Sequence, residues 1–204
     1  ARAARTLVEA SGDRASVTLV LFGGEPLLNL PALTAAVESA QAAAAERGKR
    51  LVLSMTTNGT RFTDAALDFI AAHDIGVSVS IDGPPDLHDR NRRFAGGGSS
   101  YADVVAGVAR LVARTGRAPA ARVTLTPPQW SRVPEVFDHL AALGFVEVGI
   151  APTSPVSADF LPTSAEDEAL IAGFAALARR FADAAAQGRV LPFSNLLDLL
   201  AKLH

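Results

Sequence analysis

The chain has 204 residues, which fits one domain or at most one and a half. Hydrophobic residues make up 49% and charged residues 20%, a balance typical of a folded protein with a core. The net charge of −2 provides no basic surface for nucleic acid or an anionic membrane, and no apolar run approaches the ~20 residues of a spanning helix. We therefore expect a cytoplasmic protein without nucleic-acid or membrane partners.

The sequence contains no cysteine, which excludes disulfides, thiolate zinc sites and iron–sulfur clusters held by this chain's own thiolates. The histidines His73, His139 and His204 lie in or at the ends of predicted helices without metal-ligand spacing, so we expect no metal site. The chain begins with Ala1 and ends directly after an apolar stretch, residues 193–203. We expect it to be the middle part of a longer protein.

Apolar, β-rich runs alternate with helical stretches along the chain. The predicted strands are 17–22, 51–55, 77–81, 122–126 and 145–150, and the predicted helices are 31–47, 64–72, 101–114, 133–143 and 165–187. The expected helix-capping residues are Asn29, Gly48, Gly116, Gly144, Thr163 with Glu166, and Gly188. This alternation predicts an α/β fold of parallel strands. Because no GxGxxG follows the first strand, an open or closed β/α barrel is favoured over a dinucleotide-binding sheet.

Polar residues follow the predicted strands at the ends where β/α barrels carry their active sites. The first strand leads into Gly23-Gly24-Glu25-Pro26, the second into Thr56-Thr57-Asn58-Gly59, and the third carries Ser80 and Asp82. For any single loop, ordinary turn chemistry explains these residue types. Three successive strands with the same feature favour a ligand site, because glycines let a ligand approach the backbone.

The segment after the third strand is rich in arginine and ends in a glycine run. Arg92 could bind a carboxylate or phosphate, since a guanidinium matches planar anions, whereas Arg90 and Arg93 are expected to be solvated. Asp82 and His88 are the one candidate acid–base pair for a complete, unrelated barrel hydrolase or isomerase, the least favoured interpretation.

Taken together, these motifs resemble the radical S-adenosylmethionine (radical SAM) enzymes, in particular the peptide- and protein-modifying maturases with a C-terminal SPASM domain, such as the anaerobic sulfatase maturases. The resemblance lies in the segments Phe22–Asn29, Thr57–Thr60, Ser80–Pro84, His88-Asp89-x-x-Arg92 and Gly98–Tyr101. It implies a radical SAM-type partial (β/α) barrel with about five βα units, whose first strand is missing from this chain.

The resemblance also implies roles for individual residues. Gly23 and Gly24 would lie along the methionine part of S-adenosylmethionine, and Glu25 would help to hold its amino group. Asn58 and Ser80 would contact the methionine or ribose portion, and Arg92 would bind the cofactor carboxylate or support the loop that does. Asp82 is expected to be structural or to act behind these residues. No catalytic residue is assigned.

The CxxxCxxC loop that holds the family's 4Fe–4S cluster is absent, so the cluster ligands are expected outside this chain. Residues 1–190 are then the N-terminally incomplete barrel core, and residues 191–204 begin a linker to a SPASM-like domain. The implied partners are a peptide or protein substrate and an electron donor for the cluster.

Two functions remain open. The favoured one is a bacterial maturase whose S-adenosylmethionine is reductively cleaved to a 5′-deoxyadenosyl radical that modifies a residue of a peptide or protein. The alternative is a degenerate, cluster-free barrel that binds a peptide as a scaffold. In either case the isolated 204 residues are expected to be inactive and, with strand edges unpaired, to express poorly or associate.

Overall fold

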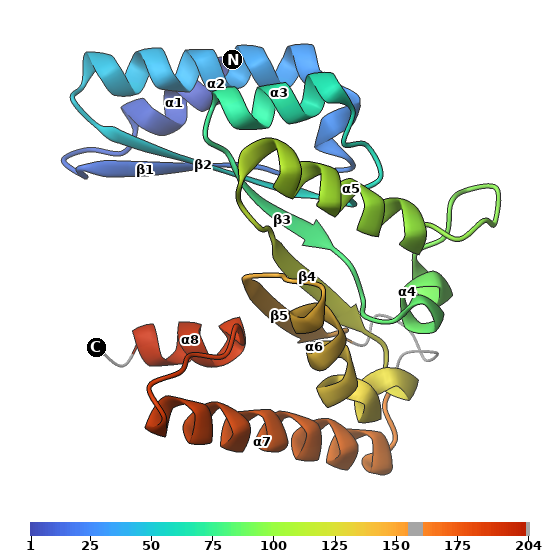
Figure 1. The fold of residues 1–204 in the computed structure, drawn as a ribbon. Helices are drawn as coiled ribbons and strands as arrows, with labels where there is room; N and C mark the ends of the chain where they lie inside the picture. Colours follow the sequence, from blue (N-terminus) through green and yellow to red (C-terminus); the bar gives the residue numbers. More distant parts are fainter. Residues whose placement is uncertain (155–160, 203–204) are drawn as a thin grey trace. The chain divides into compact units, whose positions relative to one another are not determined.

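A computed structural model describes residues 1–154 and 161–202 (Figure 1). The chain divides into two compact units. The first unit comprises residues 1–79 and 103–119, and the second unit comprises residues 80–102 and 120–204.

Five strands alternate with helices along the chain. In order, the elements are α1 (Arg2–Glu9), β1 (Ser16–Leu21), η1 (Pro26–Leu28), α2 (Leu30–Glu46), β2 (Arg50–Thr57), α3 (Asp64–Ala72), β3 (Gly76–Ser80), α4 (Pro85–Asn91), α5 (Tyr101–Thr115), β4 (Ala120–Leu125), η2 (Pro127–Arg132), α6 (Val133–Ala142), β5 (Glu147–Pro152), α7 (Ser164–Ala186) and α8 (Ser194–Ala201).

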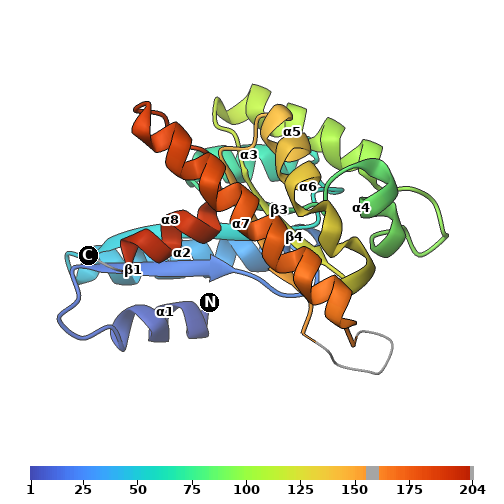
Figure 2. The ribbon, with the colours of Figure 1, turned by 90° about the horizontal axis from the view of Figure 1, so that it is seen from below.

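The first unit is built on the parallel strands β1, β2 and β3. Val17 of β1 is in register with Leu51 of β2, and Met55 of β2 is in register with Val77 of β3. Helices α1 and α2 lie beside β1 (Figure 2), where Val8, Val17 and several alanines of α2 form a buried cluster. Small alanine side chains allow these helices to pack closely on the strand, which explains an apolar core with few aromatic residues.

The second unit contains the parallel pair β4 and β5, with Val123 in register with Ile150. The N–H of Ile81, directly after β3, donates to the carbonyl of Arg122 in β4. The aromatic rings of Phe137 in α6 and Phe193 before α8 meet edge to face, with centroids 5.6 Å apart. The core of this unit is therefore formed by aromatic and large aliphatic side chains.

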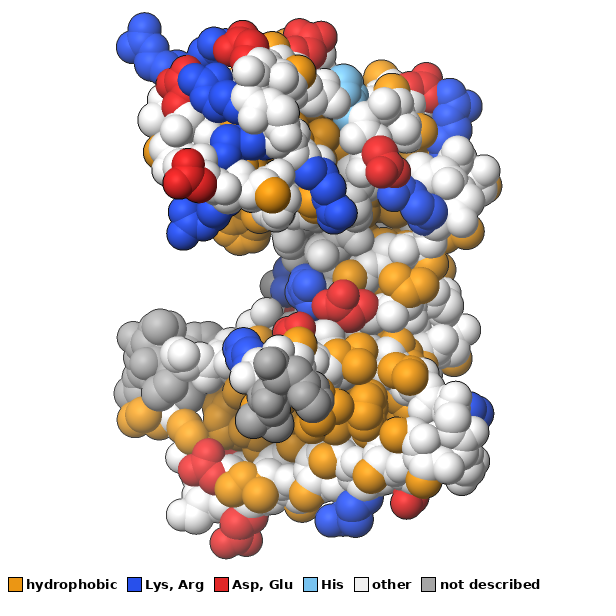
Figure 3. All heavy atoms as spheres, turned by 90° about the vertical axis from the view of Figure 1, so that its left-hand side faces the viewer, with side chains coloured by type: hydrophobic (Ala, Val, Ile, Leu, Met, Phe, Trp, Pro, Cys, Tyr) orange, Lys and Arg blue, Asp and Glu red, His pale blue; other side chains and the backbone are white. Residues whose placement is uncertain are grey.

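The surfaces of the two units differ in the view of Figure 3. Basic and acidic side chains cover much of the first unit, whereas apolar side chains gather on the part of the second unit that carries α7 and α8. Leu199 and Leu200 of α8 are among the exposed apolar residues. Among the described residues, no helix has the length and apolar character needed to cross a membrane.

The α/β fold with parallel strands, expected from the sequence, is confirmed. The caps are confirmed too: Asn29 accepts from the N–H of Ala32, Thr163 and Glu166 form a capping box, and the four capping glycines have positive φ. Some features differ. Helices α4 and α8 lie where no helix was predicted, and Phe22, predicted as the last residue of the first strand, follows β1 and is 78% exposed.

Three sequence-based expectations stay predictions: a barrel strand before residue 1, the barrel core over residues 1–190, and a linker that begins at residue 191. His204 lies outside the described residues.

Candidate functional site

The end of β1 is joined to the end of β2 by the carboxylate of Glu25. Its Oε1 accepts from the hydroxyl of Thr57 at 2.7 Å and from the N–H of Leu27 at 3.1 Å, and its Oε2 accepts from the N–H of Asn58 at 2.7 Å. We call Glu25, Thr57 and Asn58 the Glu25 turn. All three donors are neutral, and the half-buried carboxylate has spare acceptor positions for a cation.

Gly23 and Gly24 precede this carboxylate in conformations that L side chains rarely adopt. Their φ angles are 123° and 41°, and a Cβ built on either would have no atom within 4 Å. The glycines are therefore required by the backbone and not by close packing, and both are exposed. They leave open space and accessible peptide groups beside Glu25, as a ligand that lies along the backbone requires.

The turn after β2 is held in place from behind by a glycine contact. Gly59 has a φ of 76°, and a Cβ on Gly107 of α5 would lie only 2.6 Å from the carbonyl oxygen of Gly59. Helix α5 thus packs directly on this turn. The side chain of Asn58 accepts from the N–H of Thr60 with its Oδ1, which leaves its NH₂ as the group it can offer a ligand.

In the second unit a different carboxylate, Asp82, is almost completely buried, with 1% of its side chain exposed. Its Oδ1 accepts from the N–H of Thr124 in β4 at 2.8 Å, and its Oδ2 forms an ion pair with Nε of Arg92 at 2.6 Å. Gly83, with φ 106°, lets the chain turn directly against Val136 of α6, where a Cβ would approach to 2.8 Å.

His88 of α4 completes this arrangement. The N–H of Asp82 donates to Nδ1 of His88 at 3.3 Å, Nε2 of His88 lies 3.0 Å from Oγ of Ser100, and the Ser100 hydroxyl donates to the carbonyl of Arg92. We call Asp82, His88, Arg92, Ser100 and Thr124 the Asp82 network. Since Nδ1 is an acceptor, the proton of the neutral ring lies on Nε2. Burial of the ring lowers the pKa of His88 below the ordinary histidine value of 6.5.

A shallow pocket of about 540 Å³ lies beside the network within the second unit. Its lining includes Asp82, Arg92 and Thr124, with Thr126 and Thr153 from the ends of β4 and β5. Arg92 is 29% exposed, and its Nη1 and Nη2 have no hydrogen-bond partner among the described residues. The pocket therefore offers a guanidinium end and threonine hydroxyls, a combination suited to a carboxylate.

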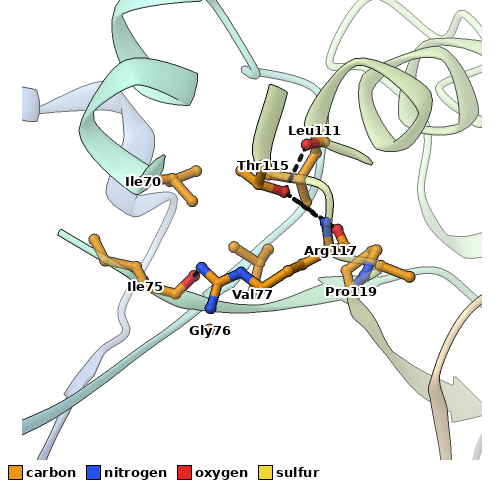
Figure 4. A pocket seen from close by; sticks show the side chains of 9 residues that line it. Ile70, Ile75, Gly76, Val77, Leu111, Thr115, Arg117 and Pro119 are labelled. Carbon is orange, nitrogen blue, oxygen red and sulfur yellow. Dashed lines mark hydrogen bonds between the residues drawn. The ribbon is translucent and has the colours of Figure 1, made fainter. Parts of the chain in front are cut away.

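A smaller pocket, of about 90 Å³, lies at the start of β3 in the first unit (Figure 4). It is lined mainly by apolar side chains such as Ile70, Ile75 and Leu111. The guanidinium of Arg117 at its rim already pairs with Asp74 at 2.6 Å. The lining thus offers little to orient a polar ligand, and the pocket lies at the strand end opposite the Glu25 turn.

The structure brings together some of the predicted site residues. Glu25 and Asn58 meet in the first unit, beside the exposed Gly23 and Gly24, while Ser80 lies half-buried at the end of β3. Arg92 belongs to the Asp82 network, in which the Asp82 carboxylate bonds to Arg92 and to the N–H of Thr124. That these residues bind a cofactor stays a prediction.

The acid–base pair of Asp82 and His88 is wrong in its geometry, because His88 accepts from the backbone N–H of Asp82 and not from its carboxylate. Thr57, Ser100 and Thr124 were not predicted as members of either cluster. Of these, Thr57 had a signal in its place beside Asn58 at a strand end, and Ser100 lies in the segment Gly98–Tyr101 that carries part of the resemblance. Within residues 1–154 and 161–202, no group of three or more His, Cys, Asp or Glu side chains is arranged to hold a metal ion.

Comparison with known proteins identifies the family. The model of the radical SAM superfamily matches residues 2–125, more than half of the chain and a stretch that includes the Glu25 turn and β1 to β4. The chain belongs to the radical SAM superfamily. A curated relative, the serine-type anaerobic sulfatase-maturating enzyme of Bacteroides thetaiotaomicron, is 37% identical over 62 residues, which are 30% of this chain and 15% of the relative.

Solved structures share the fold of this radical SAM chain. The structure of anSMEcpe with bound AdoMet and the Kp18Cys peptide has a TM-score of 0.78 at 16% identity, covering 94% of this chain and 54% of that one. Streptococcus suis SuiB bound to the precursor peptide SuiA has a TM-score of 0.54 at 15% identity, covering 87% and 37%. The chain thus spans about half the length of the first of these structures.

Radical SAM proteins use S-adenosylmethionine and a 4Fe–4S cluster. The residues of this chain do not fit the cluster, because the sequence holds no cysteine. Taken unit by unit, they offer groups that suit an ammonium ion in the first unit and a carboxylate in the second. The Glu25 turn offers an uncompensated carboxylate beside open glycine backbone, and Arg92 offers the end of a guanidinium. The family match favours a maturase over the cluster-free scaffold.

Proposed function

We propose that this chain is the central part of a SPASM-type maturase that acts on a peptide or protein. The observation that carries the proposal is the Glu25 turn, a carboxylate held by three neutral donors next to two exposed glycines, within the stretch that matches the family. When bound, S-adenosylmethionine supplies a 5′-deoxyadenosyl radical that abstracts a hydrogen atom from the substrate.

The residues of the chain bind and orient this cofactor. Glu25 accepts from the cofactor's ammonium group, since its oxygens retain acceptor capacity after the bonds from Leu27, Thr57 and Asn58. Gly23 and Gly24 let the methionine part approach the backbone. The assignments of Asn58 and Ser80 to the methionine or ribose portion rest on the family resemblance, as does that of Arg92 to the carboxylate.

The remaining parts of the function lie with other residues and partners. The cluster ligands lie outside this chain, because it has no cysteine. The proposed partners are an electron donor and a peptide or protein substrate, and the proposed location is the cytoplasm. The peptide-bound structures of anSMEcpe and SuiB support this class of substrate.

Binding of S-adenosylmethionine to the full-length protein that carries this chain tests the proposal. Isothermal titration under anaerobic conditions would compare the wild type with Glu25→Gln, which removes the charge but keeps the size of the side chain. Glu38→Gln, on the exposed face of α2, is the matched control. We expect Glu25→Gln to weaken binding about tenfold or more, since a charge-assisted hydrogen bond is lost, and Glu38→Gln to have no effect. Equal affinities for all three proteins would contradict the proposal.

A further inference from the structure

The hydrogen bonds around His88 run in one direction through the Asp82 network. The N–H of Asp82 donates to Nδ1 of His88, Nε2–H of His88 donates to Oγ of Ser100, and the hydroxyl of Ser100 donates to the carbonyl of Arg92. The ring is 1% exposed and both of its nitrogens are used. A buried imidazole in this position is held in a single tautomer by its partners.

We propose that His88 is a positioning residue for Arg92: the neutral Nε2–H imidazole fixes the guanidinium so that its terminal nitrogens face the pocket beside β4 and receive a carboxylate. This inference rests on the proposed function, in which that carboxylate belongs to S-adenosylmethionine. His88 contacts no ligand itself and acts through Asp82 and Ser100.

The geometry explains how the imidazole acts on the guanidinium. Arg92 is held at two points, its carbonyl by Ser100 and its Nε by Asp82. His88 accepts from the backbone N–H of Asp82 and donates to the hydroxyl oxygen of Ser100. With Nε and the backbone fixed, Nη1 and Nη2 are left as a planar pair of donors, which matches the two oxygens of a carboxylate.

A second layer of hydrogen bonds fixes the position of Ser100. The carboxylate of Asp89, next to His88 in α4, accepts from the N–H of Ser100 at 3.0 Å, from the N–H of Tyr101 at 3.2 Å and from the hydroxyl of Ser99 at 2.6 Å. The loop from Arg93 to Ser99 is therefore closed at its base. Its closure is what brings Ser100 within reach of the ring, so the network depends on tertiary structure and not only on the sequence of α4.

Protonation would break this arrangement at a defined atom. A proton on Nδ1 would face the N–H of Asp82, so two donors would oppose each other. The charged groups that act on the ring are Asp82 and Asp89, which favour its protonation, and Arg92, which opposes it together with burial; the ring of Tyr101 packs edge-on at 5.9 Å. Because burial holds the pKa of His88 below 6.5, affinity for the carboxylate is expected to fall as the pH falls below about 6.5.

Four variants of the full-length protein separate positioning from stability. His88→Leu removes both hydrogen bonds of the ring, His88→Asn keeps an acceptor near the place of Nδ1, and His88→Gln keeps a donor near the place of Nε2. His73→Gln, at the end of α3 in the first unit, is the matched control. We expect His88→Leu to weaken binding of S-adenosylmethionine about tenfold at pH 7.5. The variants His88→Asn and His88→Gln are expected to recover part of this loss. His73→Gln is expected to bind like the wild type.

The pH profile gives a readout that a purely structural role would not change. The wild type is expected to lose affinity at acid pH, whereas His88→Gln has no imidazole at this position and is expected to show a flatter profile. The tautomer is measured without any cofactor, by nitrogen NMR of the imidazole, and is expected to be Nε2–H. The Nδ1–H tautomer, or identical pH profiles for the wild type and His88→Gln, would overturn the inference.

Arg92→Lys distinguishes failure of this inference from failure of the proposed function. The lysine keeps a positive charge beside Asp82 but lacks the planar pair of donors. If Arg92→Lys weakens binding and none of the His88 variants does, His88 has no positioning role while the proposed function stands. If Arg92→Lys binds like the wild type, Arg92 does not receive the carboxylate and the inference is overturned with it.

Discussion

Each of the two units places a carboxylate just after a strand, and each carboxylate accepts a backbone N–H from another strand or its end. In the first unit Glu25 takes the N–H of Asn58, and in the second Asp82 takes the N–H of Thr124. The two carboxylates differ in their other hydrogen-bond partners and in their burial. Glu25 has neutral donors and is partly exposed, whereas Asp82 is buried against Arg92.

This difference separates a ligand-binding carboxylate from a structural one. The charge of Asp82 is compensated inside the protein, so it stabilises the local fold and leaves Nη1 and Nη2 of Arg92 without a hydrogen-bond partner among the described residues. The charge of Glu25 is not compensated by a cation in its turn and is available to an ammonium group. A carboxylate after a strand thus offers its own negative charge in the first unit, whereas in the second unit it holds the positively charged guanidinium of Arg92.

Removal of the buried carboxylate is expected to have the largest effect on stability. Asp82→Ala leaves Arg92 without its partner and the N–H of Thr124 without an acceptor, which we expect to cost about 3 kcal/mol. Urea unfolding followed by the fluorescence of Trp130, the single tryptophan and buried in the second unit, measures this cost.

Glu25→Ala is the matched variant in the first unit and is expected to cost only about 1 kcal/mol, because it leaves no unpaired charge and Asn58, one of its donors, is exposed to water. Circular dichroism records its unfolding transition. If Glu25→Ala proves as destabilising as Asp82→Ala, the distinction between the two carboxylates is wrong.

A glycine substitution sharpens the comparison at the turn that follows Asp82. Gly83→Ala combines a φ of 106° with a Cβ that would lie 2.8 Å from Val136, so we expect a loss of about 2 kcal/mol. Gly97→Ala, with φ 82° and no atom within 4 Å, carries only the conformational part and is expected to cost about 1 kcal/mol. Equal losses in thermal unfolding would show that Val136 moves aside without cost.

The pH dependence of stability tests the neutral imidazole of His88. Burial lowers its pKa in the folded state below 6.5, so near that pH the unfolded state binds more protons than the folded state. Stability supplied by the neutral ring is therefore complete above about pH 6.5 and is lost as the pH falls toward the lowered pKa. Denaturant unfolding between about pH 5 and 8 is expected to show this slope in the wild type and a weaker one in His88→Gln. A slope of the opposite sign would contradict the burial argument.

The alternation of strands and helices could be predicted because each element carries a local signal. The strands are apolar runs, and Asn29, Thr163 and the capping glycines act within a few residues of their own helix. Helix α4 has only seven residues, too few for a 3.6-residue repeat to be recognised, and it begins with Pro85. The exposure of Phe22 could not be predicted because its strand ends one residue earlier than the apolar run suggests.

The site could be predicted only in part, because some of its residues have a local sequence signal and others are brought together only by tertiary structure. The glycines and Glu25 stand out because their residue types are unusual directly after a strand. The pairing of Asp82 with Arg92, and the burial of His88 against Ser100, depend on how α4 and the following loop close on β4. Residue type and spacing do not report that closure, so the sequence alone suggests an acid–base pair where the structure has a backbone hydrogen bond.

An exposed ion pair provides the smallest expected effect and a direct contrast to Asp82 and Arg92. Arg110 and Asp64 approach to 2.7 Å, but their side chains are 51% and 93% exposed, so water screens their attraction. We expect Arg110→Ala to change the free energy of unfolding by less than about 1 kcal/mol, and added salt to remove most of that change. The ion pair of Arg92 is expected to respond much less to salt, since one of its partners is buried. A salt response of Arg92→Lys as large as that of Arg110→Ala would mean that burial of Asp82 does not decide the strength of its ion pair.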